Sequence, residues 1–195
     1  MTTRRVNNKV RLAGQIVYIR FFDKTATVVV NTGASEDGIH SNYPRAVVFD
    51  KVLSVAHGFK VGDYVLIDAT MQDNSNRANA NLPPRTIAVN HMVRLNPESS
   101  EYRTANRFDF WCHVINIQKV SDNKAKATAV IYTGQLNYIT VYYEAEPEKI
   151  DEFCEINNKN YVHLTGQIRT NRVLTSEGKI EFFDKLSVSN FRVVK

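Results

Sequence analysis

The sequence predicts an all-β protein of two tandem five-stranded barrels, each with one short helix. Three observations support this prediction: the chain repeats itself, each half consists mainly of strand-like segments, and each half has one helix-like segment after its third strand. A chain of 195 residues is long enough for two domains of about 95 residues each.

Four segments of the first half match segments of the second half in the same order. The first three pairs are NKVRLAGQIVYI from Asn8 with NRFDFWCHVINI from Asn106, ATVVVNTG from Ala26 with ATAVIYTG from Ala127, and DYVLIDATM from Asp63 with NYVHLTGQI from Asn160. Their starting positions differ by 98, 101 and 97 residues, and both halves close on an apolar strand, HMVRL and NFRVV. Such steady spacing indicates duplication of a whole domain.

Within each half, β-branched and aromatic residues alternate with polar ones, and Gly, Asn, Asp and Pro interrupt the runs. This pattern predicts about five strands per half. One helix is predicted in each half, over residues 51–59 and 147–156, and acidic residues at the start of the second complement its dipole. Five strands with a helix after the third is the order of an OB-fold barrel. We expect domains at 1–96 and 105–195, joined by the polar segment Leu95–Asn106.

The segment YPRAVVFDK, from Tyr43 to Lys51, is predicted to be the third strand. Because successive side chains of a strand point to opposite faces, Tyr43, Arg45 and Phe49 share one face. That face is either a surface that stacks flat rings and holds negative charge, or, at Phe49, part of the core.

Composition sets further limits. No apolar run reaches the roughly 18 residues of a membrane span, and MTTRRVNNK is not a secretory signal, so we expect a cytoplasmic protein without membrane contact. The net charge is +5, with +4 in residues 1–100 and +1 in residues 101–195. This excess fits a nucleic-acid partner, and solvated faces explain it equally well.

Two cysteines favour reduced thiols over a disulfide framework. Cys112, His113, Cys154 and His163 lack the spacing of a zinc site, and no phosphate-binding loop or nucleophile motif is present. We therefore expect no metal, no cofactor and no enzymatic activity.

The sequence resembles the single-stranded DNA-binding proteins of the bacterial and phage SSB type. NKVRLAGQI is similar to that family's opening strand, YPRAVVFDK to its third strand, and GDYVLIDATMQ to its fourth, with Ala69 at a usual glycine that Gly166 keeps in the second half. The family's acidic C-terminal tail is missing, since the chain ends NFRVVK, and so are most of its stacking tryptophans. A phage, plasmid or other mobile element fits this resemblance as a source.

The resemblance implies that single-stranded DNA is the partner and that the Tyr43 face binds it. Tyr43 and Phe49 would stack bases, and Arg45 would hold phosphate or lie on a base. QDNSNRANANLPPR is predicted to be the hairpin between strands four and five that wraps ligand, with Arg77 and Arg85 as its charges, or else a solvated loop. Lys24 and Lys9 are weaker candidates.

In the second half the equivalent strand is NYITVYYE. Aligning Phe49 with Tyr143 leaves Asn137 opposite Tyr43. Trp111 points outward by strand parity, as a stacking platform or an interface plug. The candidate binding residues here are Trp111, Tyr138, Tyr143, Lys124, Lys126, Arg169 and Arg172.

The leading hypothesis is a protein that coats and protects single-stranded DNA in replication or recombination. The alternatives are an OB-fold adaptor that docks replication or recombination proteins, and a single-stranded RNA-binding protein. Proteins of the SSB type usually gather four OB domains, which would need a homodimer of this chain. The opening strands, 10–19 and 108–117, are the expected pairing edges, either between two chains or within one chain as a pseudo-dimer.

Overall fold

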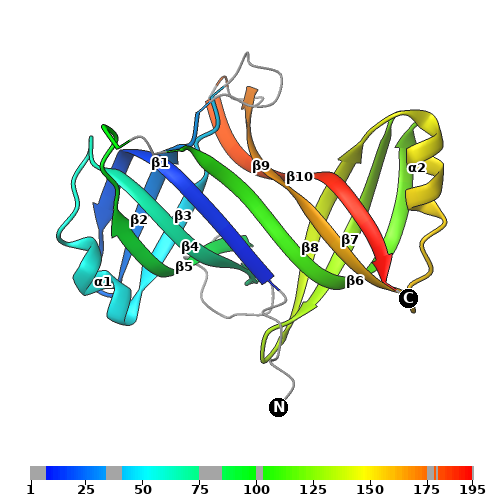
Figure 1. The fold of residues 1–195 in the computed structure, drawn as a ribbon, viewed down its shortest axis with the longest axis horizontal. Coiled ribbons are helices and arrows are strands. Elements are labelled where there is room, and N and C mark those ends of the chain that lie inside the picture. Colours follow the sequence, from blue (N-terminus) through cyan, green and yellow to red (C-terminus); the bar gives the residue numbers. More distant parts are fainter. Residues whose placement is uncertain are drawn as a thin grey trace.

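The computed structural model describes residues 8–33, 41–74, 85–99, 103–174, 178 and 180–194. Its elements form two barrels with a helix at each outer end (Figure 1). The first contains β1 Asn8–Phe21, β2 Thr25–Asn31, β3 Arg45–Phe49, α1 Asp50–Ala56, β4 Tyr64–Asp73 and β5 Arg85–Arg94. The second contains β6 Ala105–Ser121, β7 Lys124–Tyr132, β8 Leu136–Glu144, α2 Pro147–Cys154, β9 Tyr161–Leu174 and β10 Ile180–Val194.

Strand pairing closes each barrel in the same order. In the first, β1 pairs β2, β2 pairs β3, β3 pairs β5, β5 pairs β4, and β4 returns to β1. The second repeats this order from β6 to β10. The β3–β5 and β8–β10 pairs are parallel and the others antiparallel. The predicted all-β tandem OB fold, with one helix after each third strand, is confirmed.

The barrel interiors follow from the alternation in the sequence. In β2 the side chains of Ala26, Val28 and Val30 are buried in the core, whereas Thr27 and Val29 between them are only half-buried. Larger rings fill the second barrel, where Phe108 and Phe110 stack with centroids 4.6 Å apart.

One asparagine near the start of each opening strand pairs its side-chain amide with a backbone peptide. Asn8 donates to the Met71 carbonyl over 2.7 Å and accepts from the Met71 N–H over 2.9 Å. Asn106 makes the same two bonds to Ile168, at 2.7 and 2.9 Å. The amide thus extends the strand ladder by one peptide, and the duplication preserves this contact.

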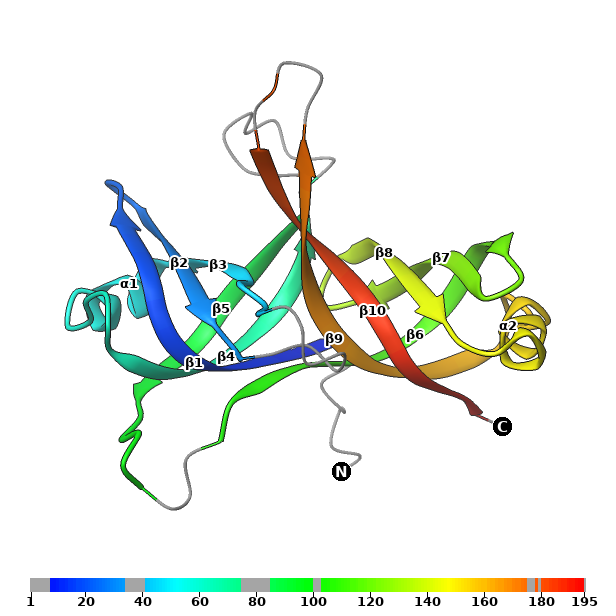
Figure 2. The same ribbon diagram turned by 90° about the horizontal axis from the view of Figure 1, so that it is seen from above.

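Strand β1 is long enough to join the two barrels. One edge pairs β4, and the other pairs β2 over Gln15–Phe21 and β6 over Asn8–Ala13. In the β1–β6 pair, Asn8 lies opposite Phe110 and Ala13 opposite Ala105. The predicted pairing of the opening strands therefore occurs within one chain, and Figure 2 shows both barrels beside this seam.

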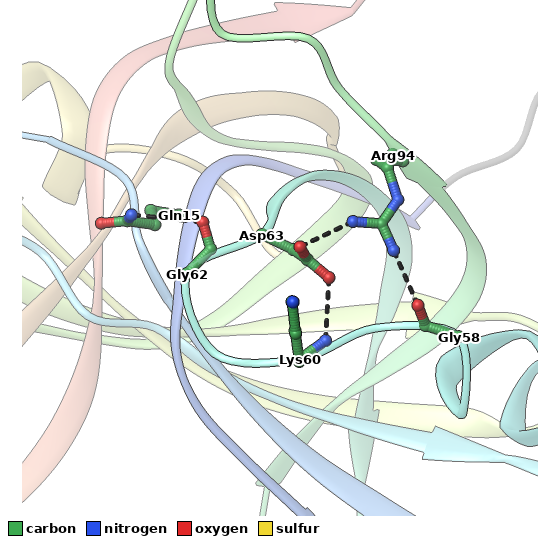
Figure 3. A network of polar contacts seen from close by, with 6 residues as sticks. All are labelled: Gln15, Gly58, Lys60, Gly62, Asp63 and Arg94. Carbon is green, nitrogen blue, oxygen red and sulfur yellow. Dashed lines mark hydrogen bonds and ion pairs between the residues drawn. The ribbon is translucent and has the colours of Figure 1, made fainter.

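An ion pair fixes the turn that leads from α1 into β4. The guanidinium of Arg94 lies 2.6 Å from Asp63 and also donates to the Gly58 carbonyl (Figure 3). Asp63 accepts the Lys60 N–H as well, and the Arg94 hydrogen bond is the main cause that lowers the pKa of its carboxyl group. The end of β5 is thereby tied to the start of β4.

Gly166 allows the second barrel to close over a large ring. A Cβ atom there would lie 2.0 Å from the Ser187 carbonyl oxygen and 2.6 Å from the Phe108 ring. Phe108 pairs directly with Gly166, whereas the equivalent Ala69 pairs with the smaller Val10. At Gly166 both the Phe108 ring and the Ser187 carbonyl exclude a methyl group, whereas Ala69 faces a smaller side chain.

We expect Gly166→Ala to lower the free energy of unfolding by at least about 2 kcal/mol, because the added methyl group overlaps backbone and ring atoms that cannot both retreat. Urea unfolding followed by circular dichroism measures this change. Ala69→Gly is the matched control and should cost no more than about 1 kcal/mol. Equal effects of the two substitutions would contradict the explanation.

Candidate nucleic-acid interface

The outer face of β3 carries the residues that the sequence singles out. Ala46 and Val48 point into the core, whereas Tyr43 and Arg45 are exposed on the other side. Phe49 is half-buried and lines a surface hollow with Lys51, Gln72 and Asn90 among its other walls. Neither ring is sealed inside the barrel.

Strand β1 adds a tyrosine and an arginine to this face. Tyr18 pairs with Val29 on β2, which in turn pairs with Arg45 on β3. Two residues further along β1, Arg20 pairs with Thr27 of β2. Residues directly opposite in antiparallel strands share a face, so Tyr18 and Arg20 continue the β3 surface. Tyr18 is 44% exposed. Simple alternation would place Tyr18 on the same inward face as Ile16, but a bulge between these two residues turns Tyr18 and Arg20 outward, so the sequence pattern does not reveal either residue.

Two further rings lie at the end of β1 and in the turn that follows it. Phe22 is 49% exposed, and the Arg20 guanidinium lies 5.0 Å from its centroid. Phe21 stacks on His57, with centroids 4.3 Å apart. Lys24, predicted as a weaker candidate, is exposed in the same turn. This end of the barrel combines flat rings with cations.

The second barrel reaches this face through its β9–β10 hairpin, which projects between the two barrels in Figure 2. Phe182 and Phe183, on β10, are both exposed. Phe182 lines a cavity together with Tyr43 and Arg45, and Phe183 lines a neighbouring one with Arg45. These phenylalanines lie far from β3 in the sequence, so only the fold brings them to it.

Each barrel hydrogen-bonds to the other at the same two-residue element, Asn–Tyr, which lies just before β3 in the first barrel and within β8 in the second. The Tyr43 N–H donates to Thr170 Oγ1 over 2.9 Å, and Asn42 Oδ1 accepts the Thr170 N–H over 3.2 Å. Reciprocally, the Tyr138 N–H donates to Asp73 Oδ2 over 3.3 Å, and Asn137 Oδ1 accepts the Asp73 N–H over 3.1 Å.

A second pair of hydrogen bonds between the barrels involves the residues that face Thr170 and Asp73 across the two hairpins. Asp184, opposite Thr170 on the β9–β10 hairpin, accepts the Arg45 N–H over 3.1 Å. Arg85, opposite Asp73 on β4–β5, donates to the Thr140 carbonyl over 3.1 Å. Both asparagines of the Asn–Tyr elements are buried, while both tyrosines are exposed. The hydrogen bonds that join the barrels thus also fix the positions of the exposed rings of Tyr43 and Tyr138.

This symmetry corrects the alignment of the two halves. Ile16 pairs with Val30, and the equivalent Val114 pairs with Ala129, so the second strands differ by 99 positions instead of 101. Continuing to β3 and β8 places Tyr138 at the position of Tyr43 and Glu144 at that of Phe49. The predicted match of Phe49 with Tyr143 is one residue out, and a shift of one residue changes the face.

Tyr143 is accordingly wrong as a stacking platform. It is 6% exposed and packs against Phe153 and Phe191 in the core, where burial raises the pKa of its phenol. Tyr138 is the outward tyrosine of the second barrel.

The remaining first-barrel candidates lie apart from the β3 face or are already engaged. Lys9 is exposed on the β1–β6 seam, opposite Asp109. Arg85 begins β5, is half-buried and donates to the Thr140 carbonyl of the second barrel, and its role in binding stays a prediction. Arg77 lies outside the described residues.

Three cations of the second barrel surround one carboxylate, that of Glu144. Glu144 lies 3.2 Å from Lys124 and also pairs with Lys185, whose hydrogen bond is the main cause that lowers the pKa of Glu144. Arg169 lies 3.9 Å from the same carboxylate. Lys126 is exposed. Arg172 is part of β9, but its side chain lies outside the described residues.

Trp111 lies on the outer face of the second barrel and is half-buried. Its ring stacks on His163 with centroids 4.3 Å apart, and His163 in turn contacts Asp109. One ring face is therefore covered, and both predicted roles for Trp111 stay predictions.

Among the described residues, no three His, Cys, Asp or Glu side chains gather as a metal site would require. Burial raises the pKa of the Cys112 thiol to about 12.

Comparison with solved structures finds proteins of similar fold. The wild-type single-stranded DNA-binding protein from Thermus aquaticus superposes with a TM-score of 0.65 at 10% sequence identity, covering 96% of this chain and 93% of that chain. A deletion mutant of that protein gives 0.67 at 10% identity, with 96% and 94% covered. This chain has the same tandem OB fold. The predicted resemblance to the SSB type is confirmed at the level of the fold.

Sequence comparisons do not add to this result. No protein-family model matches the chain, and no curated protein matches it significantly. Neither helix of the described part is long and apolar enough to cross a membrane.

We expect Asn137→Ala to lower the free energy of unfolding by about 2–4 kcal/mol, because it removes several partly buried hydrogen bonds of a fully buried residue and leaves partner groups unsatisfied. Hydrogen exchange of the Asp73 amide should accelerate as well, since its acceptor is lost. The exposed Asn123 supplies the control, and Asn123→Ala should change stability by less than about 0.5 kcal/mol. An unchanged Asp73 amide would contradict the docking role.

Proposed function

We propose that this protein binds single-stranded DNA, with the outer face of β1, β2 and β3 as the main site. The observation that carries the proposal is one surface on which Tyr18, Phe22 and Tyr43 are exposed beside Arg20 and Arg45. Bases stack on aromatic rings for about 1–3 kcal/mol each, and cations hold the phosphates between them. The fold shared with the Thermus aquaticus protein supports the same ligand class.

Little of this recognition depends on which base is present, because every base has a ring face. Phe49 would extend the row of rings from its half-buried position, and Lys24 would add charge at the end of the barrel. Binding of this kind coats a strand and protects it, without chemistry on the nucleic acid.

The second barrel is the weaker binder in this proposal. It keeps Tyr138, but it carries Thr140 where the first barrel has Arg45, and Glu144 where the first has Phe49. A carboxylate at that position offers no ring to a base, and Thr140 brings no cation to hold a phosphate. Tyr138, Lys126 and Trp111 would make secondary contacts as a longer strand leaves the first barrel.

The setting that we propose is DNA replication or recombination inside the cell, alongside other proteins of those processes. Two chains would supply four barrels, so a homodimer is part of the proposal. RNA is the competing ligand, because stacking does not itself distinguish ribose from deoxyribose.

The test is a fluorescence anisotropy titration with labelled dT and rU oligonucleotides at two salt concentrations. We expect low-micromolar or tighter binding of dT that weakens as salt rises, because each neutralised phosphate releases counterions. Tyr43→Ala should weaken binding by roughly 5- to 150-fold, the equivalent of one lost stacking contact.

Tyr132→Ala is the matched control, since Tyr132 is the most exposed of the tyrosines that the structure describes and lies on the second barrel. It should change the affinity by less than about threefold. Binding without salt dependence, or equal losses in both variants, would overturn the assignment of the site. Tighter binding of rU would move the ligand class to RNA.

A further inference from the structure

A cavity of about 350 Å³ lies between β2 and β3 of the first barrel and the β9–β10 hairpin of the second. It is lined by Val29, Tyr43, Arg45, Thr170, Phe182 and Asp184. Its volume falls at the lower end of the range for small-molecule sites, about 300–1,000 Å³. The walls combine two exposed rings, those of Tyr43 and Phe182, with a few polar groups.

The carboxylate of Asp184 is the fixed polar group of this cavity. One oxygen accepts the Arg45 N–H over 3.1 Å, and the other accepts the Thr170 hydroxyl over 3.3 Å. Contacts from both barrels therefore hold it in place. Burial is the main cause that raises the pKa of the carboxyl group. Because each carboxylate oxygen can accept about two hydrogen bonds, acceptor capacity remains for a ligand.

We propose that this cavity binds one unstacked nucleobase that carries an exocyclic amino group, with the base against Tyr43 and Phe182 and its amine donating to Asp184. The inference rests on the proposed binding of single-stranded DNA and adds a base preference at one position. Enzymes that read an extruded base use the same combination of ring contacts and hydrogen bonds to the base edge.

The acceptor decides which bases fit. Cytosine, adenine and guanine present amino donors, and a carboxylate accepts well from the cytosine amine. Thymine has no exocyclic amine, and its only ring N–H stands between two carbonyl oxygens, which a carboxylate repels. The Arg45 guanidinium lines the same cavity and can hold a phosphate of the bound nucleotide.

The pseudo-equivalent position on the other hairpin lacks this chemistry. Arg85 occupies the place of Asp184, because it faces Asp73 across β4–β5 as Asp184 faces Thr170 across β9–β10. Its guanidinium donates to the Thr140 carbonyl. A cation there offers donors only, so the carboxylate site belongs to the β9–β10 side.

The experiment compares labelled dC and dT oligonucleotides of equal length at one salt concentration. We expect wild type to bind dC about 5- to 20-fold more tightly than dT. Asp184→Asn should reduce this ratio to below about twofold, since the amide adds a donor where the carboxylate only accepts. Phe182→Ala should also lower the ratio, and this ring is 63% exposed, so its removal should leave the fold intact.

Phe22→Ala is the control, because it removes an exposed ring outside the cavity. It should weaken dC and dT binding by the same factor. Equal affinity of wild type for dC and dT, or an unchanged ratio in folded Asp184→Asn, would overturn the pocket while leaving the proposed function in place. Failure to bind either oligonucleotide would overturn both. If Asp184→Asn does not fold, the wild-type ratio and Phe182→Ala decide the question.

Discussion

Antiparallel pairing of β1 with β6 holds the two barrels in one orientation, and the other contacts between them depend on it. Small barrels of this size bury modest cores, and an unpaired strand edge on either would attract other chains. Here β1 pairs with β4 of its own barrel along one edge and with β6 along the other, and β6 likewise pairs with both β9 and β1. With the seam fixed, each hairpin stem reaches the third strand of the opposite barrel, and the two Asn–Tyr elements can form their exchanged hydrogen bonds.

The duplication explains the fold, and the differences between the copies explain the assignment of function. Both barrels keep the asparagine that extends the strand ladder and the Asn–Tyr element. They differ on the outer face of the third strand, where Arg45 and Phe49 of the first barrel are replaced by Thr140 and Glu144. What the copies share is architecture. What distinguishes the first copy on this strand is the arginine and the phenylalanine.

Much of the fold is predictable from local pattern in the sequence. Alternation, one helix per half and the steady repeat lead to two OB barrels, and parity alone separates Tyr43 and Arg45 from the core residues Ala46 and Val48. These features depend on neighbouring residues only. The pairing of the opening strands follows from the apolar edges that they would otherwise expose.

The candidate site is only partly predictable, because bulges and long-range register decide it. The bulge after Ile16 turns Tyr18 outward, and an error of one residue in aligning the third strands exchanges buried Tyr143 for the exposed face. Phe182 and Asp184 reach Tyr43 from another barrel, and no local pattern encodes that contact. Local pattern therefore predicts one strand of the surface, and the other residues come together only in the tertiary structure.

The Asn–Tyr exchange has a consequence for dissecting this molecule into halves. Severing the chain near residue 100 would remove the acceptors of the Tyr43 and Arg45 amides and would leave the edge of β1 that faces β6 unpaired, although every residue of the first barrel would be present. Weak DNA binding by such a fragment would then reflect the loss of these supporting contacts. It would not show that the surface of the first barrel lacks binding residues.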